Sequence, residues 1–385
     1  MRALRQKIHD LQLNNIFVVL RSCGVGGQRE MLAALAQGYT PVDLSLPNLR
    51  LQVEQNPQLF LSGLRLPAYL ANLHYAPSLL EHLLRSGVPA DKLLAGCSQS
   101  YYLQALAERE EAARVVFLDL PLTLDADTVE PFTPTAACLA KLTQKRRDIF
   151  TAIVQGGTDS GGEELGAYIS GVVQREIMEQ TTVSDAMKFY RFLCVAASMT
   201  GTVVNYSRLC SGVGVTAPTA KQWLQFLAGT GVVYLLQPLD RLGGKRMVKA
   251  PKLYFRDTGV AAQLLQIGDA RALAQSFYLK NLFDNYVVNL LREGYLRQGG
   301  GQRLLFYQDS NYKEISLLLR VDDTLHPINI CKDGFSVRKT QKSFELLRGY
   351  AEEHGAALGN GCVIGMGGAS RLLDGGLYYV PAEYI

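Results

Sequence analysis

The feature that most constrains this chain is a strand, a glycine-rich turn and an amphipathic helix that follow one another between residues 18 and 35. Val18-Val19-Leu20 has the apolar run of a buried strand, and Gly24, Gly26 and Gly27 supply the turn. Such a turn leaves backbone N–H groups and the positive end of the helix facing outward, where they attract an anion. The segment therefore predicts a parallel α/β domain with an anion-binding loop at the end of this strand.

The chemistry that usually accompanies such a loop is missing. A Walker A loop reads G-x-x-x-x-G-K-[ST], in which the lysine reaches the β- and γ-phosphates of ATP and the hydroxyl holds Mg²⁺. Here Gly27 replaces the lysine and Gln28 replaces the hydroxyl, while Arg21 and Arg29 flank the loop as substitute cations. We predict a vestigial nucleotide site formed by Arg21, Gly24, Gly26, Gly27, Gln28 and Arg29.

Length and composition indicate a globular protein of several domains. With 385 residues the chain exceeds the usual size of one hydrophobic core, so two or three domains are expected. No run approaches the roughly 18 uncharged apolar residues of a membrane helix. Residues 1–7 predict a basic amphipathic helix and lack the apolar region of a signal peptide. We therefore expect a cytoplasmic protein.

The cysteines and histidines predict no metal site. The seven cysteines are an odd number without a C-x-x-C pair, and the five histidines are scattered. This pattern argues against a disulfide framework and a zinc site, and fits thiols in a reducing compartment. We expect Cys23, Cys97 and Cys331 to be buried and unreactive.

Positive charge is distributed unevenly, although the net charge is only +4. Residues 240–252 contain five basic side chains and one acid, and Lys141, Lys145, Arg146 and Arg147 form a second cluster. Such runs are either solvated surface or contacts for a polyanion, and charge alone leaves both readings open.

The sequence divides into segments of different character. The first third alternates apolar strands (16–20, 40–44 and 114–118) with helical stretches, as in a parallel α/β sheet. Residues 121–134 and 156–162 are rich in proline, acid or glycine and are predicted to be linkers. Residues 164–198 have helical periodicity without a turn. The last third predicts a helix at 282–291, strands at 304–307, 315–319, 327–330, 362–364 and 377–380, and a helix at 340–354.

Residues 204–255 predict a winged helix. A short helix (206–210) and a glycine turn precede a second helix in which Thr216 is the N-cap and Ala220, Trp223, Leu224 and Leu227 share an apolar face. A strand (232–236), a basic glycine tip and another strand (252–255) follow. The residues predicted to contact DNA are Thr216, Thr219, Lys221 and Gln222 in the groove and Lys245, Arg246 and Lys249 at the phosphates.

These residues resemble a family of prokaryotic AAA-superfamily P-loop ATPases with a C-terminal winged helix and a restriction-endonuclease-like domain. The resemblance covers almost the whole chain. Residues 67–80 are similar to the family pattern P-x-x-x-D-E-x-Q-x-x-P-x-L-L, and residues 94–99 resemble L-T-G-S-Q with one insertion. The most specific similarity lies in residues 205–221 and 244–259.

The chain departs from this family at the positions that carry its chemistry. Ala71 and Asn72 stand where the Walker B acids are expected. Residues 314–318 and 327–331 resemble the nuclease patterns E-V-D-L-L and P-I-E-I-K, but Ser316, Asn329 and Cys331 replace the aspartate, glutamate and lysine. Glu314, Asp284 and Lys332 remain nearby, with Lys332 on the opposite strand face from Cys331.

The resemblance implies four domains: a degenerate AAA-type P-loop domain (1–133), a helical lid or linker (134–180), a winged helix (181–260) and a restriction-endonuclease-like domain (261–385). One hypothesis is a scaffold, both pseudo-ATPase and pseudo-nuclease, that binds DNA or an acidic protein partner through the winged helix and needs no cofactor. The other is a protein that still binds or hydrolyses ATP with Mg²⁺ through Arg21 or Arg29. The sequence alone leaves both open.

Overall fold

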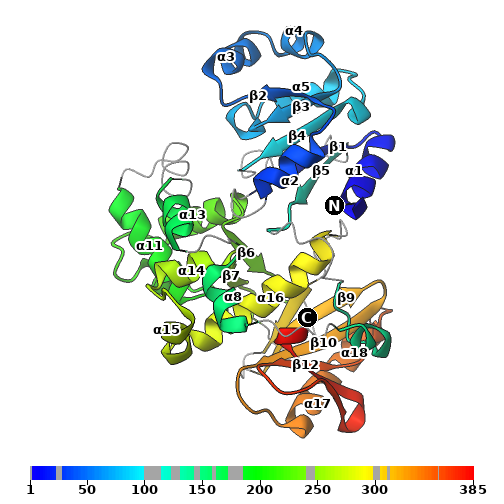
Figure 1. Ribbon diagram of the computed structural model, residues 1–385, viewed down its shortest axis with the longest axis vertical. Coiled ribbons are helices and arrows are strands. Elements are labelled where there is room, and N and C mark those ends of the chain that lie inside the picture. The colour runs from blue at the N-terminus through cyan, green and yellow to red at the C-terminus, as the bar shows by residue number, and fades with distance from the viewer. Residues whose placement is uncertain are drawn as a thin grey trace. The chain divides into compact units, whose positions relative to one another are not determined.

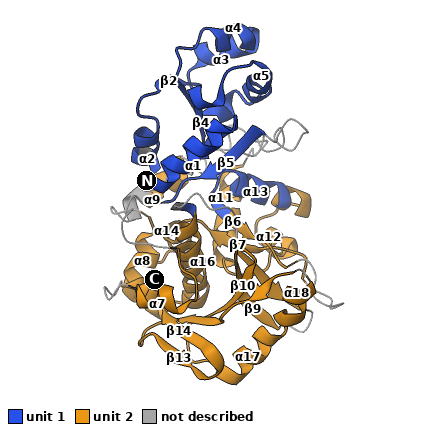
Figure 2. Cartoon of the chain, turned by 90° about the vertical axis from the view of Figure 1, so that its right-hand side faces the viewer, with its two compact units in different colours: residues 1–126, 221–233, 296–299 blue, residues 127–220, 234–295, 300–385 orange. Residues whose placement is uncertain are grey.

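The structure, a computed structural model, forms two compact units (Figure 2). Unit 1 comprises residues 1–126, 221–233 and 296–299, and unit 2 comprises 127–220, 234–295 and 300–385. Because helix α13 (Ala217–Gly229) contributes to both units, this division is coarser than the four predicted domains, which stay a prediction. The described residues are 2–22, 28–98, 114–122, 131–142, 148–157, 162–171, 185–239, 248–297, 304–309, 313–353 and 355–385, without the side chains of 29, 162–164 and 297.

Unit 1 contains a parallel sheet, as the alternation of strands and helices predicts. Its described strands are β1 (Phe17–Arg21), β2 (Thr40–Asp43), β3 (Ala68–Ala71), β4 (Leu93–Cys97) and β5 (Val115–Asp119). They lie in the order β2-β3-β4-β1-β5, and every neighbouring pair is parallel. β1 is therefore an interior strand between β4 and β5 (Figure 1).

Both faces of this sheet are covered by apolar clusters. Successive side chains of β1 point to opposite faces, so alternate residues belong to different clusters. Phe17 and Val19 belong to one apolar cluster, which includes residues of α3 (Pro47–Gln55), α4 (Pro57–Ser62) and α5 (Leu79–Arg85). Val18 and Leu20 belong to another cluster with residues of α1 (Arg2–Leu13) and α2 (Gln28–Leu35). The near-continuous apolar run of β1 thus reflects a strand buried on both faces.

The helical part of unit 2 includes the first predicted helix and the turn, and the second predicted helix, α13, begins in unit 2 and continues in unit 1. Its helices are α7 (Ala136–Ala140), α8 (Ile149–Gln155), α9 (Gly162–Tyr168), α11 (Ala186–Ser198), α12 (Tyr206–Cys210), α14 (Thr258–Leu264) and α15 (Ala270–Gln275). Asn205 caps α12 by accepting a hydrogen bond from the Arg208 amide. Gly212 and Gly214 turn the chain toward α13 in the left-handed conformation. β6 (Val233–Leu236) and β7 (Lys252–Phe255) pair with each other.

The predicted linker at 156–162 lies between α8, which ends at Gln155, and α9, which begins at Gly162. Its first residues are anchored, because the Gly157 amide donates to the buried Asp257 carboxylate at 3.0 Å and a Cβ at Gly156 would overlap the same carboxylate. The predicted helical segment at 164–198 contains more than one helix, since a new helix begins at α11, where Asp185 accepts from the Lys188 amide. Val172, Val173 and Ile177 of that periodicity lie outside the described residues.

Helix α16 (Leu279–Arg297) links the central elements of unit 2 through a row of asparagines at four-residue spacing. Asn281 donates to the Thr200 carbonyl, and Asn289 donates to the Phe255 and Arg256 carbonyls. Asn285 accepts hydrogen bonds from Thr200 Oγ1 and the Phe255 amide and donates to the Phe255 carbonyl. These bonds satisfy backbone groups at the buried end of β7.

The C-terminal part of unit 2 contains the predicted mixed sheet. The described strands are β8 (Leu304–Gln308), β9 (Glu314–Val321), β10 (Thr324–Cys331), β11 (Ala357–Leu358), β12 (Cys362–Gly365), β13 (Arg371–Leu373) and β14 (Leu377–Pro381). Their order is β13-β14-β12-β10-β9-β8, and β11 also pairs with β10. The helix predicted at 340–354 is two helices, α17 (Val337–Glu345) and α18 (Leu347–Glu353).

Candidate functional site

The carboxyl ends of the unit 1 strands form the first candidate site. In an open parallel sheet, ligands bind where the strand order reverses, and here that point is the end of β1 beside β4 and β5. Arg21, the last residue of β1, pairs in register with Asp119 of β5. Its Nε lies 2.7 Å from Oδ1 of Asp119, so a carboxylate compensates part of the positive charge of Arg21.

Gln28, at the position of the Walker hydroxyl, points into unit 1. Its side chain is fully buried at the start of α2. Oε1 of Gln28 accepts from the Ser22 hydroxyl at 3.0 Å, and Nε2 donates to the Leu120 carbonyl at 2.8 Å. The amide thereby ties α2 to the segments that follow β1 and β5. Of the other vestigial residues, Gly24, Gly26 and Gly27 lie outside the described residues, as does the side chain of Arg29.

Asn72, which stands where the second Walker B acid is expected, forms a hydrogen-bonded pair with the carboxylate of Asp43. Asn72 follows β3 in the left-handed conformation with a φ of 57°, and its Nδ2 donates to Oδ1 of Asp43 at 2.9 Å. The Ser45 amide donates to the same oxygen. Burial opposes ionisation of Asp43, but these hydrogen bonds outweigh it and keep the pKa of Asp43 below its usual value. Ala71, at the position of the first acid, supplies no ligand atom from its side chain.

His74 and Ser98 form a further polar pair at this edge, which the sequence reading missed. Oγ of Ser98 lies 3.3 Å from Nε2 of His74, and Nδ1 of His74 has no partner among the described residues. Burial lowers the pKa of His74 to about 4, although the nearby Asp43 opposes that change. A neutral histidine results at physiological pH. Only one feature of the sequence could have indicated this polar cluster. Asp43, Asn72 and Ser98 each lie at the end of a strand or directly after it.

Of the three cysteines expected to be buried, Cys97 is buried, Cys331 is only half-buried, and Cys23 lies outside the described residues. Burial raises the pKa of the Cys97 thiol to about 12, against the effect of Arg21. The preceding Gly96 is required by packing, since a Cβ there would overlap the hydroxyl of Tyr69. A protonated, buried thiol at this strand end is a poor nucleophile.

Helix α13 provides the second candidate site. Ala220, Trp223, Leu224 and Leu227 are buried, which confirms the predicted apolar face. Pro218, Lys221, Gln222 and Gln225 are exposed at helical spacing and form the opposite face.

Of the other residues predicted to contact DNA, Thr216 and Thr219 lie at the start of this helix. Thr216 caps α13, accepting from the Thr219 amide, and the two threonine hydroxyls lie 2.9 Å apart. Lys249 is exposed next to β7, whereas Lys245 and Arg246 lie outside the described residues.

The nuclease-like positions of unit 2 are joined by hydrogen bonds. The Ser316 amide donates to Oδ1 of Asn329 at 3.2 Å, and Oγ of Ser316 accepts from the Ile330 amide at 3.1 Å. These bonds cross from β9 to β10. The two substituted side chains thus bind backbone groups of the sheet.

Lysines compensate the two acids that remain nearby. Nζ of Lys252 lies 2.5 Å from Oε1 of Glu314, and Nζ of Lys280 lies 2.6 Å from Oδ2 of Asp284. Burial raises the pKa of Asp284 despite Lys280, and it also raises the pKa of the neighbouring Cys331 thiol. In the described part of the chain, no three His, Cys, Asp or Glu side chains converge to hold a metal ion.

The comparisons with known proteins identify relatives of unknown activity. Residues 150–271, which include α12, α13, β6 and β7, match a family described as a domain of unknown function, DUF8612. Over 240 residues the chain is 29% identical to uncharacterized proteins of Mycobacterium bovis and of Mycobacterium tuberculosis. The match covers 61% of this chain and 53% of each relative, so the chain spans about half the length of the curated relatives it matches.

Among solved structures, a chain from the structure of Drosophila ORC bound to AT-rich DNA and Cdc6 is similar at 11% identity and a TM-score of 0.23. The alignment covers 69% of this chain and 90% of that chain. A TM-score this low does not establish a common fold. Within the described residues, no helix is both long and apolar enough to cross a membrane.

Proposed function

We propose that this chain is a catalytically degenerate AAA-type protein that binds double-stranded DNA through a winged helix formed by residues 185–255. The observation that carries the proposal is the charge of this segment. It contains nine lysines and arginines and two acids, whereas the whole chain has a net charge of only +4. Positive charge concentrated on one module is typical of proteins that contact the phosphate backbone.

The elements of the segment fit a winged helix. α12, the turn through Gly212 and Gly214, and α13 are followed by the paired strands β6 and β7. Val203 forms an isolated antiparallel bridge with Lys252, which adds a third extended segment beside β7. In such a module the second helix of the turn enters the major groove.

The exposed face of α13 has suitable chemistry for that role. Lys221 can pair with a phosphate, and Gln222 and Gln225 carry amides that donate to and accept from base edges. Arg208 of α12 and Lys249, which precedes β7, are also exposed cations of the proposed module. No acid lies between residues 186 and 239 to repel a phosphate.

The loss of catalysis in the proposal is supported by the state of the former catalytic positions. The side chain of Gln28 is engaged by Ser22 and Leu120, and that of Asn72 by Asp43. In unit 2, the side chain of Asn329 accepts from the Ser316 amide, and Oγ of Ser316 accepts from the Ile330 amide. Phosphoryl transfer requires a lysine and Mg²⁺-binding groups, and metal-assisted phosphodiester cleavage requires converging carboxylates. Side chains already committed to hydrogen bonds within the fold are poor replacements for either set.

The proposal is tested by titrating the full chain against a labelled 20-base-pair duplex at several salt concentrations. For the parent protein we expect the logarithm of the affinity to fall steeply with the logarithm of the salt concentration. The Lys221→Ala variant should have a slope that is shallower by about one unit, since one phosphate contact is lost.

Lys339→Ala, which removes an exposed lysine of α17, is the matched control and should leave the slope unchanged. Absence of duplex binding, or equal slopes for the parent and the Lys221→Ala variant, would contradict the proposal. Salt-insensitive binding to a protein would instead identify α13 as a docking helix.

A further inference from the structure

The exposed face of α13 is a single stripe along the helix. Its four residues follow one another at i, i+3, i+4 and i+7, and they are Pro218, Lys221, Gln222 and Gln225. Gln222 and Gln225 are separated by about 4.5 Å along the helix axis, and successive base pairs of DNA are about 3.4 Å apart. Their amides are therefore suitably spaced for contacts with two different base pairs of one major groove.

The amides of Gln222 and Gln225 have chemistry that distinguishes bases. Both side chains are exposed, and neither forms a hydrogen bond with another residue of the described chain. A glutamine amide combines an acceptor oxygen with a donor nitrogen, which matches the N6 donor and the N7 acceptor of adenine in the major groove. Guanine presents two acceptors there, O6 and N7, and leaves the amide oxygen without a partner. The two glutamines therefore favour adenine.

The other residues of the stripe do not oppose this selection. Guanine is read most often by arginine or lysine, and cytosine by an acid that accepts from N4. The stripe has no arginine and no acid, and its one lysine, Lys221, has a phosphate as its partner in the proposed function. Pro218 offers only apolar contact, for which the methyl group of thymine is the partner in the major groove. The stripe thus matches A·T pairs.

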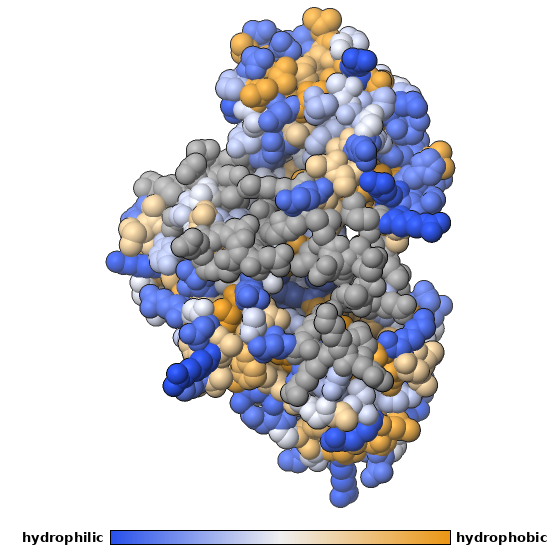
Figure 3. Space-filling view, viewed as in Figure 1, coloured by the Kyte–Doolittle hydropathy of each residue, from blue (hydrophilic) through white to orange (hydrophobic). Residues whose placement is uncertain are grey.

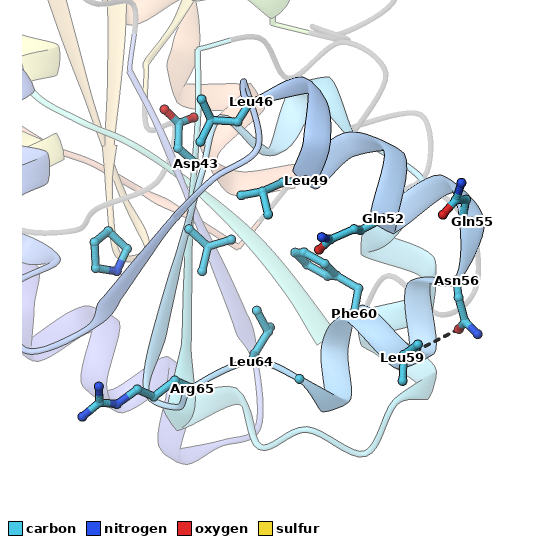
Figure 4. A pocket seen from close by; sticks show the side chains of 13 residues that line it. Asp43, Leu46, Leu49, Gln52, Gln55, Asn56, Leu59, Phe60, Leu64 and Arg65 are labelled. Atoms are coloured by element: carbon cyan, nitrogen blue, oxygen red, sulfur yellow. Dashed lines mark hydrogen bonds between the residues drawn. The ribbon is translucent and has the colours of Figure 1, made fainter.

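Helix α3 has the same glutamine spacing in different surroundings. Gln52 and Gln55 are exposed and three residues apart, but they line an apolar groove of about 680 Å³ on unit 1 (Figure 4). Leu51, which is 53% exposed, precedes Gln52, whereas Lys221 precedes Gln222. Hydrophobic residues gather over α3 and α4 in Figure 3. Phosphate groups are poorly accommodated on such a surface, so α3 supplies control glutamines for those of α13.

We infer that α13 reads adenine in the major groove, with the amides of Gln222 and Gln225 each donating to N7 and accepting from N6 of an adenine. This inference rests on the proposed function, because it requires α13 to enter the groove. Each such contact should favour adenine over guanine by about tenfold, and contacts at separate base pairs are roughly additive. The chain should therefore prefer duplexes rich in A·T pairs by about a hundredfold when both glutamines are engaged.

The test compares labelled duplexes of the same length that differ only in their central pairs, which are A·T, G·C or inosine·cytosine. An inosine·cytosine pair has the major-groove pattern of G·C but lacks the amino group of guanine in the minor groove, as A·T does. Binding to the full chain is measured by fluorescence anisotropy at one fixed salt concentration. The parent should bind the A·T duplex about a hundredfold more tightly than either of the other two.

Gln222→Ala and Gln225→Ala should each reduce this preference by about tenfold and leave the salt dependence unchanged, because no phosphate contact is lost. Gln52→Ala removes an exposed glutamine of α3 and is the matched control, which should keep the full preference. Thermal melts establish that the variants are folded. An unchanged preference in both α13 variants would overturn the inference.

The outcomes separate this inference from the proposed function. Equal affinity for the A·T and G·C duplexes, with a steep salt dependence, would overturn the reading of adenine and leave DNA binding intact. A preference for A·T that inosine·cytosine retains would also overturn it, since the bases would then be read through the minor groove or the shape of the duplex. Absence of binding to every duplex would contradict the proposed function itself.

Discussion

At the scale of single residues, side chains at positions where the family resemblance leads us to expect catalytic groups are hydrogen-bonded within the fold. Gln28 is the clearest case, because its amide uses both of its polar atoms to hold Ser22 and Leu120. A shorter hydroxyl at this position could not reach both groups. Gln28 therefore connects α2 to the segments that follow β1 and β5.

Gln28→Ala should lower the free energy of unfolding by about 2–3 kcal/mol, because two buried groups lose this partner. The measurement is urea denaturation followed by circular dichroism. Gln58→Ala removes an exposed glutamine of α4 and should change stability by less than about 0.5 kcal/mol. Equal denaturation midpoints for the two variants would show that the Gln28 bonds contribute little.

His74 should make stability depend on pH. Its pKa is lowered from 6.5 to about 4 by burial, so between these values the unfolded chain binds a proton that the folded chain does not. The contribution of His74 to the free energy of unfolding is complete above pH 6.5 and should fall by about 3 kcal/mol as the pH decreases toward 4.

Denaturation of the parent and of His74→Gln at a series of pH values measures this effect. The difference between the two curves should change across the window from pH 6.5 to 4. The exposed His9→Gln variant is the control and should follow the parent curve. A constant difference between the His74→Gln and parent curves would show that His74 is accessible to protons in the folded chain.

At the scale of elements, helix α16 stabilises unit 2 through polar contacts as well as apolar packing. Asn281, Asn285 and Asn289 recur every four residues and therefore lie on one face of the helix. All three bind carbonyl groups at Thr200 or at the end of β7. A helix can replace strand pairing in this way where a short strand ends inside the protein.

Asn285→Ala should lower the free energy of unfolding by about 3–5 kcal/mol, because it removes two accepted hydrogen bonds and one donated hydrogen bond from a buried position. Thermal or chemical denaturation measures the loss. Asn48→Ala, at an exposed position of α3, should have almost no effect. If both variants have the same melting temperature as the parent, the asparagine row does not stabilise the fold.

At the scale of the whole molecule, the two places where the family resemblance leads us to expect catalytic groups lie in different units, and neither has those groups. The unit 1 position has Gly27 and Gln28, and the unit 2 positions have Ser316, Asn329 and Cys331. Lys252 and Lys280 also compensate the nearby acids. Release from catalysis is a common cause that would account for both changes.

The full chain should therefore show no increase in melting temperature with ATP, with or without Mg²⁺, and no phosphate release. A nucleotide present at about 100 times its Kd would add about 2.7 kcal/mol of stability, which a thermal shift detects readily. A shift without phosphate release would indicate a nucleotide-dependent scaffold. Phosphate release would contradict the loss of catalysis and direct mutagenesis to Arg21 and Arg29.

Local patterns predicted much of the fold. The apolar run at β1, the helix faces of α13 and the alternating strands of the C-terminal sheet were all identified from residues close together in the chain. The helices α3 and α4 and the four-residue strand β3 were missed, because Ala68–Ala71 is too short to show a period and both helices retain apolar residues on exposed sides.

The sequence by itself determined the α/β class, the residue types that stand where the resemblance leads us to expect catalytic groups, and the concentration of positive charge, since these depend on residue identity and local spacing. Only the tertiary structure decided that Arg21 meets Asp119, that Asn72 meets Asp43 and that Ser98 meets His74. These pairs depend on which strands are neighbours. Strand order is set by the burial of both sheet faces over long separations in the chain, and no local pattern records it.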